Sequence, residues 1–578
     1  MTIVNDMTFR IAGAAGQGVE SSGAGFAEAL AKGGLHVFGL QDYMSRIRGG
    51  LNFAQVRIHE QPLYSHQEPV HILLPLNEEA LDAYQGDVIN GGGIIYDEAF
   101  KVETQAISGG DRKAMPVPLT DIAKEHGDRV MVNTAALGAA AGVVDYAYER
   151  LADVIRKNFK RKGGEVVAAN LRVARAAYLY AHERYAADFQ WKVQEVPGAP
   201  QRMRITGNQA FALGALAGGC RFVSAYPMTP ATSIIEWMAR HEHQYGVIAK
   251  HAEDEIAAIN MAIGANLAGV RAMTSTSGGG FSLMVEALGL AGMCEIPLVV
   301  LEAQRGGPST GLPTRTEQSD LLFVLNASQG EFPRLVLAPG TIEEYFECGW
   351  RAFNLAERYQ TPVIVLSDEL LAASSRTLDI TALDFDKVTI ERGKFLTEKE
   401  LDGLTEPYKR HQFSEDGISP RAVPGHPNAV YASASDEHDE FGHITENMTN
   451  RAKMMRKRMT KLETACQEIR PPARYGPDEA PIALIGWGST YGVLREAVDR
   501  LAGQARLVHF CDLWPFPVEA AKTALKGSTL VVVENNYTCQ FKRLLQGETC
   551  LPVAHTISRY DGHPFSPEDV LAGLKEVM

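Results

Sequence analysis

The chain lacks the sequence patterns that bind iron–sulfur clusters or structural zinc. Its seven cysteines are scattered and no CxxC pair occurs, so neither kind of site is expected within this chain. No apolar run approaches the roughly 20 residues that a membrane span needs. The start of the chain shows no basic segment followed by an apolar one, so no signal peptide is expected, and reduced thiols in a cytoplasm fit this pattern.

The chain also has fewer basic residues than acidic ones. The formal net charge of -14 argues against a nucleic-acid partner, which would favour basic stripes. Apolar residues make up 45% of the chain and charged residues 22%, as in an ordinary globular protein. A length of 578 residues is too great for one core, so several domains are expected.

Apolar runs and composition shifts divide the chain into four parts. Residues 1–195 open with a βαβ pattern around the motif GAAGQG. Residues 200–375 contain near-continuous apolar runs such as IPLVVLEA and TPVIVLSD, which are typical of parallel strands buried on both faces. Residues 376–478, rich in charge, Pro, Gly and His, are expected to be a solvated crossover segment, and residues 479–578 form another α/β unit. The sequence therefore predicts a multi-domain α/β protein with parallel or mixed sheets flanked by helices.

The motif GAAGQG has two interpretations. A glycine-rich turn before a helix suits an anion such as phosphate, because the helix N-terminus presents free N–H groups. A tight strand-to-helix turn without a ligand explains the glycines equally well. In the downstream motif RIRGG, Arg46 and Arg48 are candidates to hold a phosphate or simply lie on the surface.

The motif YPMTPAT follows a short apolar strand. Its prolines predict a rigid loop at the carboxyl end of that strand, where ligands bind in open α/β sheets. Tyr226, Pro227 and Thr229 belong to this loop. A proline-stiffened helix cap is the competing interpretation.

The motif HAEDE begins a helix with a cluster of acids, which the helix dipole favours at that end. After Glu255 the helix is almost wholly apolar, so we expect it to be buried. A carboxylate at the mouth of a buried helix is usually retained because it pairs with something.

Two further loops complete the set. TSTSGGG is rich in hydroxyls and glycines, which permits close backbone approach to a ligand, although a helix-capping loop would look the same. RGGPSTGLPTR places Arg315 in a stiff loop after an apolar strand, an arrangement that suits a bidentate grip on a carboxylate.

In this order, the motifs resemble the α subunit of 2-oxoacid:ferredoxin oxidoreductases. The region with GAAGQG and RIRGG resembles the γ subunit of that family, fused ahead of α. EHDEFGHITE, GWGST and WPFP extend the resemblance over nearly the whole chain, and the details most resemble the 2-oxoglutarate branch. The resemblance implies a thiamine pyrimidine-binding, transketolase-like domain and a C-terminal domain of the transketolase-C type.

The resemblance also implies roles for individual residues. Glu255, with Glu253 as the fallback, would contact N1′ of thiamine diphosphate and favour the tautomer that removes the C2 proton. Thr229 would contact the oxo and carboxylate groups of the substrate, and Arg315 would hold the carboxylate. Arg46 and Arg48 are candidate contacts of coenzyme A (CoA), and no metal ligand is expected in this chain. The cofactor-binding set comprises Glu255, Tyr226, Pro227, Ser275, Thr276, Ser277 and Gly278.

Half of such a catalytic centre is missing from the sequence. The chain contains no GDG motif, which in this class helps to bind Mg²⁺ and the diphosphate, and it has no cluster-binding cysteines. The resemblance therefore implies a separate β chain that carries the diphosphate half-site, Mg²⁺ and a [4Fe–4S] cluster, in an (αβ)₂ heterotetramer that reduces ferredoxin. The implied reaction is CoA-dependent oxidative decarboxylation of 2-oxoglutarate to succinyl-CoA and CO₂, and the chain alone should be inactive. The alternatives are another 2-oxoacid (pyruvate, a branched-chain oxoacid or an aryl-pyruvate) or a non-catalytic nucleotide-binding module.

Overall fold

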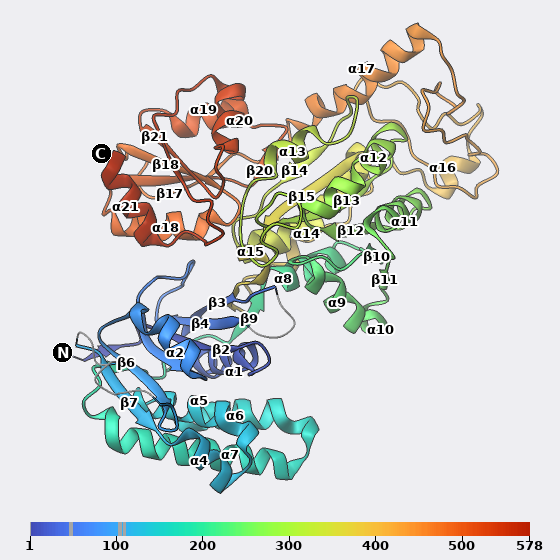
Figure 1. Cartoon of the computed structure of the whole chain (residues 1–578). Coiled ribbons are helices and arrows are strands. Elements are labelled where there is room, and N and C mark those ends of the chain that lie inside the picture. Colours follow the sequence, from blue (N-terminus) through green and yellow to red (C-terminus); the bar gives the residue numbers. More distant parts are fainter. Residues whose placement is uncertain (1, 46–49, 102–106, 108–110, 578) are drawn as a thin grey trace. The chain divides into compact units, whose positions relative to one another are not determined.

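The computed structural model describes residues 2–45, 50–101, 107 and 111–577. It divides into two units, each built around its own sheets (Figure 1). The first unit consists of Met1–Ile205, Ala373–Ala382 and Ser566–Glu568, and the second of Thr206–Ala372, Leu383–Phe565 and Asp569–Met578. Among the described residues, no helix is both long enough and apolar enough to cross a membrane.

The first unit contains a mixed sheet. Its described strands follow the order β7 (Lys113–Val117), β6 (Val88–Asp97), β5 (Val70–Pro75), β2 (Met7–Ala14), β4 (Leu51–His59), β3 (His36–Asp42), β16 (Ser375–Asp379) and β9 (Arg202–Thr206). Its helices include α1 (Val19–Lys32), α2 (Glu78–Tyr84), α4 (Leu119–His126), α5 (Val132–Val143), α6 (Tyr148–Phe159) and α7 (Gly164–Ala181).

The expected βαβ pattern appears as β2, α1 and β3, with an additional strand between the two β-strands. β4 pairs antiparallel with both β2 and β3, so β2 and β3 run in the same direction. Beyond β3, the strand β16 comes from residues far along the chain and pairs antiparallel at Ser375 and Arg376. The backbone N–H of Val37 donates to the Thr377 hydroxyl at 2.8 Å, which adds to this pairing.

The second unit contains the sheet that the apolar runs predict. Its described strands follow the order β11 (Ile248–His251), β10 (Phe222–Ala225), β12 (Ala272–Thr276), β13 (Leu298–Gln304), β15 (Pro362–Asp368), β14 (Leu335–Leu337) and β20 (Asp512–Trp514). These strands pair in parallel except for β20, which pairs antiparallel with β14.

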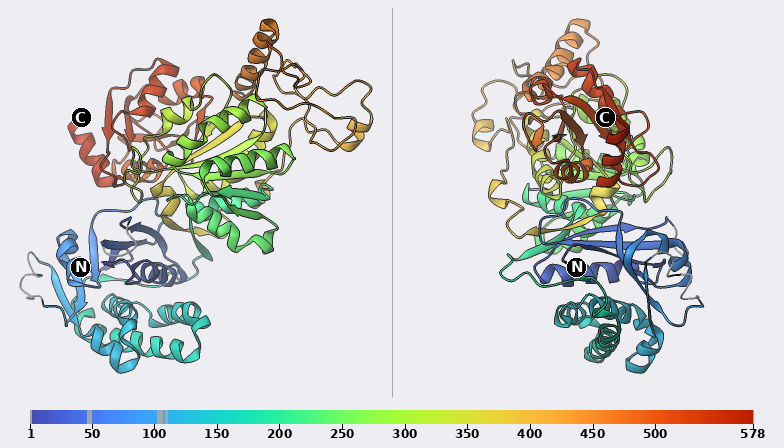
Figure 2. Two further views of the ribbon diagram at one scale, coloured as in Figure 1. Left: turned by 45° about the vertical axis from the view of Figure 1, so that its right-hand side comes forward. Right: turned by 90° about the vertical axis from the view of Figure 1, so that its left-hand side faces the viewer.

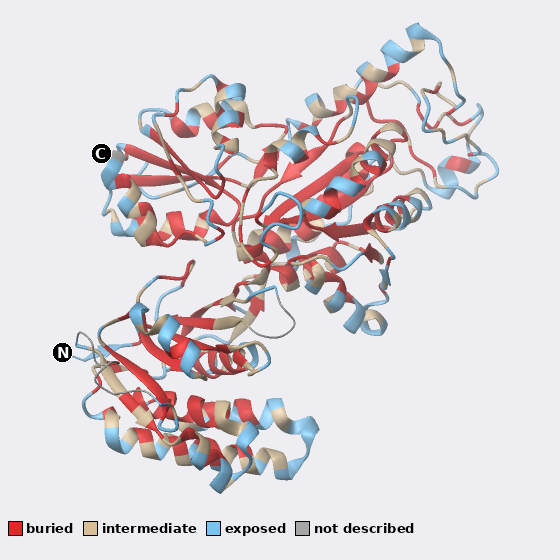
Figure 3. Cartoon of the chain, viewed as in Figure 1, coloured by how far each residue is buried: buried red, intermediate tan, exposed pale blue. Residues whose placement is uncertain are grey.

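Helices cover both faces of this sheet, which explains why β13 and β15 are buried along their whole length (Figures 2 and 3). Alternate residues of β13 pack into different cores: Leu298 and Val300 join the core of α11 and α12, whereas Val299 and Leu301 join the core of α8, α9 and α14. The helices are α8 (Gly207–Ala217), α9 (Thr232–Arg240), α10 (Glu242–Tyr245), α11 (Glu255–Leu267), α12 (Gly278–Met293), α13 (Leu321–Asn326), α14 (Ile342–Tyr359) and α15 (Glu369–Ala373).

A second sheet in the same unit is formed by the end of the chain. Its described strands are β17 (Ala473–Tyr475), β19 (Ala505–Phe510), β18 (Ile482–Trp487), β21 (Thr529–Glu534) and β22 (His555–Ser558), in that order. The helices α18 (Thr490–Arg500), α19 (Val518–Leu525), α20 (Gln540–Thr549) and α21 (Pro567–Val577) accompany them. Trp487 and Phe510 belong to the same hydrophobic core as Val300 and Ile364, so the two sheets are joined by shared packing. The predicted α/β class with parallel and mixed sheets is confirmed.

The crossover segment departs from the solvated surface expected for it. It contains the short helix α16 (Glu398–Asp402) and the basic helix α17 (Met448–Ala465). Lys457 and Lys461 of α17 are buried and form ion pairs of 2.5 Å with the buried Glu295. Burial alone raises the pKa of Glu295, but the two lysine ammonium groups outweigh it and hold the pKa well below its usual range. This part of the segment is therefore anchored in the protein by buried charge.

Candidate functional site

All four motifs leave neighbouring parallel strands at the same edge of the sheet. YPMTP follows β10, SGGG follows β12, and RGGPSTGLPTR begins at the end of β13. HAEDE continues from β11 into α11. Because the carboxyl ends of parallel strands meet at one edge, the four motifs gather there.

Glu255 is the first residue of α11 and is only 4% exposed. The preceding Asp254 caps the helix, since its side chain accepts a hydrogen bond of 2.7 Å from the backbone N–H of Ala257. Capping is thus assigned to Asp254, and the carboxylate of Glu255 is available for another task. The fallback residue Glu253 is exposed.

The N-terminus of α12 lies directly against Glu255. A Cβ atom added to Gly280 would lie 2.7 Å from Cγ and 2.8 Å from Oε1 of Glu255, and it would also collide with the Thr276 hydroxyl. Only glycine fits at this position without a shift of its neighbours. The two helix N-termini therefore meet at the Glu255 carboxylate, and their dipoles favour negative charge there.

The hydroxyls of TSTSGGG lie at the end of β12 and at the N-cap of α12. Ser275, Thr276 and Ser277 are buried. Within the described part of the chain, the hydroxyl oxygens of Thr274, Ser275 and Ser277 have no hydrogen-bond partner. Buried polar groups are normally satisfied, so this cluster is suited to hold water or part of a ligand.

The YPMTP loop is joined to the other motifs. Arg305 donates a hydrogen bond of 2.8 Å from Nη1 to the backbone carbonyl of Thr229, which fixes that residue beside the loop after β13. Thr276 Oγ1 lies 4.0 Å from the Met228 sulfur, and the Tyr226 ring centre lies 6.2 Å from that of His251. Tyr226 is 39% exposed, and Pro227 is exposed as well. The predicted residues from the first three motifs are therefore neighbours.

Arg315 occupies the base of its own loop. Its carbonyl accepts from the backbone N–H of Gly306 at 3.2 Å, and the Gly306 carbonyl accepts from Leu312 at 2.7 Å. These bonds close residues 306–315 into a compact turn that carries the half-buried Arg315 at one end. Arg305, which holds Thr229, begins the same loop.

A group of buried and partly buried acids at this edge was not predicted from the sequence. Glu302 of β13 is fully buried and is paired with Thr276 of β12 in the sheet. Burial raises the pKa of Glu302 well above its usual range, and the negative charges of Asp320 and Asp368 raise it further. Burial also raises the pKa of Asp320 to about 6, and its Oδ2 would lie 2.5 Å from a Cβ on Gly278. The available signal was an acid inside the otherwise apolar run IPLVVLEA.

The prediction that the whole of α11 is buried is wrong. Ala258, Ile259, Ala262 and Ile263 lie in a hydrophobic core, but Ile256 is 50% exposed and Met261 is 38% exposed, so only one face of the helix is buried. On α12, Leu283 is 53% exposed. The helices beside Glu255 thus present apolar side chains to their surroundings.

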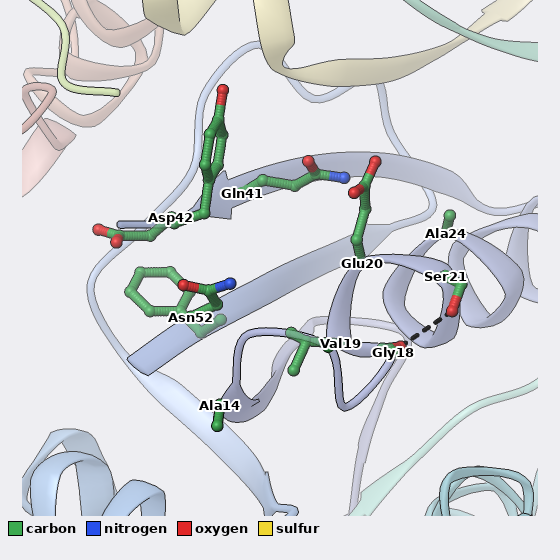
Figure 4. Close-up of a pocket in the computed structure, with 12 residues that line it drawn as sticks. Ala14, Gly18, Val19, Glu20, Ser21, Ala24, Gln41, Asp42 and Asn52 are labelled. Atoms are coloured by element: carbon green, nitrogen blue, oxygen red, sulfur yellow. Dashed lines mark hydrogen bonds between the residues drawn. The ribbon is translucent and has the colours of Figure 1, made fainter. Parts of the chain in front are cut away.

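The glycine-rich turn of the first unit borders a cavity of about 600 Å³ (Figure 4). Gly18 adopts a left-handed conformation with φ of 74°, and a Cβ there would lie 2.7 Å from Asn133 Nδ2. Carboxylates of Glu20 and Asp42 line the cavity from α1 and β3, so its described wall does not by itself favour a bare anion. Arg46 and Arg48 lie outside the described residues, and their role as CoA contacts stays a prediction. Among the described residues, no group of three His, Cys, Asp or Glu side chains is placed to hold a metal ion.

Family models match two parts of the chain. The family model "Pyruvate flavodoxin/ferredoxin oxidoreductase, thiamine diP-bdg" matches residues 213–457, and "Pyruvate ferredoxin/flavodoxin oxidoreductase" matches residues 8–180. The 2-oxoacid:ferredoxin oxidoreductase subunit alpha of Sulfolobus sp is 34% identical, with 99% of this chain and 97% of that protein covered. The 2-oxoglutarate oxidoreductase subunit KorA of Mycobacterium tuberculosis is 31% identical over 98% of this chain and 91% of its own length.

A solved structure is also similar over the whole chain. It is the 2-oxoglutarate:ferredoxin oxidoreductase from Magnetococcus marinus, described with 2-oxoglutarate, coenzyme A and succinyl-CoA bound. Its chain is 35% identical, with a TM-score of 0.92 and 99% of each chain covered.

Proposed function

Because the chain belongs to the family of 2-oxoacid:ferredoxin oxidoreductase α subunits, we propose that it is the fused γα subunit of a 2-oxoglutarate:ferredoxin oxidoreductase. The enzyme would convert 2-oxoglutarate and CoA to succinyl-CoA and CO₂, and it would also run in reverse as a carboxylase. The oxidation releases two electrons, which would leave one at a time to ferredoxin. Membership in an enzyme family removes the reason for proposing a non-catalytic nucleotide-binding module.

The buried carboxylate of Glu255 carries the proposal. A thiamine pyrimidine ring needs a carboxylate held in a dry site, and Glu255 is buried against Gly280 where any side chain would intrude. The chain's thiamine-binding domain includes this residue. When bound, thiamine diphosphate supplies the carbon nucleophile and the electron sink for decarboxylation. Glu255 would share a proton with N1′ of the ring, and the hydroxyls of Ser275, Thr276 and Ser277, with Gly278, Tyr226 and Pro227, would surround it.

Thr229 and Arg315 would hold the substrate. The Thr229 hydroxyl is suited to donate to the oxo or carboxylate group, and Arg305 fixes the backbone that carries it. A guanidinium such as that of Arg315 can grip a carboxylate through two parallel hydrogen bonds. The choice of 2-oxoglutarate is supported by the names of the similar Magnetococcus marinus structure and the Mycobacterium tuberculosis subunit.

A β chain would complete the centre. The sequence has neither the GDG motif nor paired cysteines, so the diphosphate, Mg²⁺ and a [4Fe–4S] cluster would be bound by that partner. The helices α11 and α12, whose N-termini meet at Glu255, carry exposed apolar residues that provide a surface for such a partner: Ile256, Met261 and Leu283. We therefore propose an (αβ)₂ assembly located in the cytoplasm, with thiamine diphosphate between the chains.

The test is to co-express this chain with its β partner, purify the complex without oxygen and assay a panel of 2-oxoacids. The assay would contain CoA and a low-potential one-electron acceptor. We expect turnover only when both chains are present, with the highest kcat/KM for 2-oxoglutarate. A higher kcat/KM for pyruvate, a branched-chain oxoacid or an aryl-pyruvate would mean that this compound, and not 2-oxoglutarate, is the substrate. Turnover by this chain alone would refute the proposal that it holds only half of the catalytic centre.

A further inference from the structure

The loop that carries Arg315 is built against the end of the chain. We use the name arginine loop for residues 305–320. At Gln318 this loop runs beside the segment that follows β21, and both belong to the second unit. The backbone N–H of Gln318 donates to the Asn535 carbonyl at 2.7 Å, and the N–H of Asn535 donates to Gln318 Oε1 at 3.1 Å.

Buried amide side chains extend this junction. Gln318 is fully buried and donates from Nε2 to the Trp487 carbonyl at 2.9 Å. Asn536 is 1% exposed and donates to the Gln318 carbonyl at 2.9 Å. Gln540 donates to the Ser319 carbonyl at 2.6 Å. Since breaking a buried amide pair leaves polar groups unsatisfied, these bonds hold the arginine loop in one position.

A glycine from the same region contacts Arg315 itself. Gly562 is buried and has φ of +85°, a conformation that side chains rarely adopt. A Cβ at Gly562 would lie 2.9 Å from Cβ and 3.2 Å from Cγ of Arg315. The contact is with the stem of Arg315, which cannot move aside as the tip of a flexible side chain can. The loop of Gly562 is linked to the same junction, because Asn535 Nδ2 donates to the His563 carbonyl at 3.4 Å.

We propose that the C-terminal region positions Arg315 for the carboxylate of the 2-oxoacid. Gln318, held by Asn535 and Asn536, fixes the end of the arginine loop, and Gly562 fixes the stem of Arg315. These are positioning residues that act through Arg315. The inference rests on the proposed role of Arg315 and assigns a task in substrate binding to a region that carries none of the thiamine motifs.

The chain offers a matched pair of glycines for the test. Gly527 has φ of +83°, and a Cβ there would meet nothing within 4 Å. Gly562→Ala and Gly527→Ala therefore carry the same backbone strain, and only the first displaces Arg315. In the assembled αβ enzyme, we expect Gly562→Ala to raise the KM for the 2-oxoacid about 10- to 100-fold, as misplacement of a substrate-holding group does, while thiamine binding stays unchanged. Gly527→Ala should leave the KM within about twofold of the parent.

A double variant separates positioning from general damage. If Gly562 acts through the guanidinium, adding Gly562→Ala to Arg315→Ala should produce no further rise in KM. If Gly562→Ala and Gly527→Ala have the same KM, the inference is overturned, even if Arg315→Ala raises the KM. An unchanged KM in Arg315→Ala would instead remove Arg315 from the proposed function, and the positioning role with it.

A second variant covers the case in which Gly562→Ala fails to assemble. Gln540→Met keeps the length of the side chain but loses the bond to Ser319 and the bond of 2.8 Å from the Leu322 N–H. We expect a rise in KM in the same direction and of smaller size, with kcat nearly unchanged. An unchanged KM in an intact Gln540→Met enzyme would then contradict the inference.

Discussion

Helices α11 and α17 differ in a way that reverses the usual link between composition and burial. α11 is almost wholly apolar, yet Ile256 is half exposed. α17 is strongly basic, yet Lys457 and Lys461 are buried on Glu295. A charged helix is buried where opposite charge is fixed in place, and an apolar face stays exposed where the chain offers nothing to cover it.

The buried carboxylates of Glu295 and Glu255 differ in their partners. Glu295 neutralises buried cations and holds the crossover segment, which is a task within the fold. Among the described residues, no ion pair involves Glu255, although it is nearly as buried. A buried acid without a cation is costly to keep, so its partner is expected to come from outside the chain.

The largest expected effect is on catalysis. Glu255→Gln in the assembled enzyme should slow exchange of the C2 proton of bound thiamine diphosphate by a factor on the order of 10²–10⁴, because the amide cannot share the proton at N1′. Exchange followed by proton NMR in deuterated buffer measures this. The control is Glu253→Gln, an exposed neighbour two residues earlier, which should exchange at the parent rate. Slow exchange in Glu253→Gln together with the parent rate in Glu255→Gln would assign the contact with N1′ to Glu253.

The next effect is on stability. Glu295→Gln leaves the charges of Lys457 and Lys461 buried without a counter-ion, and it should lower the free energy of unfolding by about 3–5 kcal/mol. Denaturant titration monitored by tryptophan fluorescence measures the change. Glu519→Gln, which removes an exposed partner of Lys522, should cost less than about 1 kcal/mol. Equal losses would show that the cluster on α17 behaves as surface charge.

A smaller effect is expected on assembly. Leu283→Asp places a charge on the apolar surface of α12, which should weaken β-chain binding by roughly 1–3 kcal/mol while the thermal midpoint of this chain alone stays unchanged. Titration calorimetry measures the affinity. Met448→Asp is the control, because Met448 is an 81% exposed apolar residue on α17. If both variants bind equally well, the surface beside Glu255 is not the interface.

The smallest effect concerns Glu302. Its raised pKa means that it stays protonated in the folded state, so its contribution to stability is present below the unfolded pKa and is lost as pH rises through the folded pKa. Glu302→Gln removes this dependence, since glutamine is always neutral. Asp320, Asp368 and Arg305 are the charged groups that face it.

We therefore expect the thermal midpoint of Glu302→Gln, relative to the parent, to rise between pH 5 and pH 8. Thermal unfolding at the two pH values measures the difference. Glu286→Gln, at an exposed position of α12, should track the parent at both. A constant gap for Glu302→Gln would mean that Glu302 ionises in the folded protein.

The sequence predicted the parts of the site that local pattern controls. Strand ends, glycine turns and the acid that begins α11 follow from neighbouring residues, and the position of YPMTP at the carboxyl end of a strand was predicted in this way. The family and the α/β class follow from the same motifs and are confirmed. The capping role of Asp254 was not separated from that of Glu255, because both acids suit a first helical turn.

What the sequence did not predict depends on residues far apart along the chain. Burial of Lys457 requires Glu295, which lies 162 positions earlier. The junction of Gln318 with Asn536 spans 218 positions. Ile256 is exposed because no other part of the described chain covers it. The apolar composition of α11 alone suggested that it would be buried. Such pairings are set by tertiary packing, which leaves no periodic signal in the sequence.

The strand β16 has a consequence for how this protein can be divided. It supplies residues 375–379 to a sheet whose other strands, apart from β9, come from the first 117 residues. If the chain were cut near residue 195, the N-terminal piece would be left with β3 as an open edge. The two pieces would then have to rejoin by adding strands across the break, as in donor-strand complementation. Fusion into one polypeptide makes that association permanent and removes its dependence on concentration.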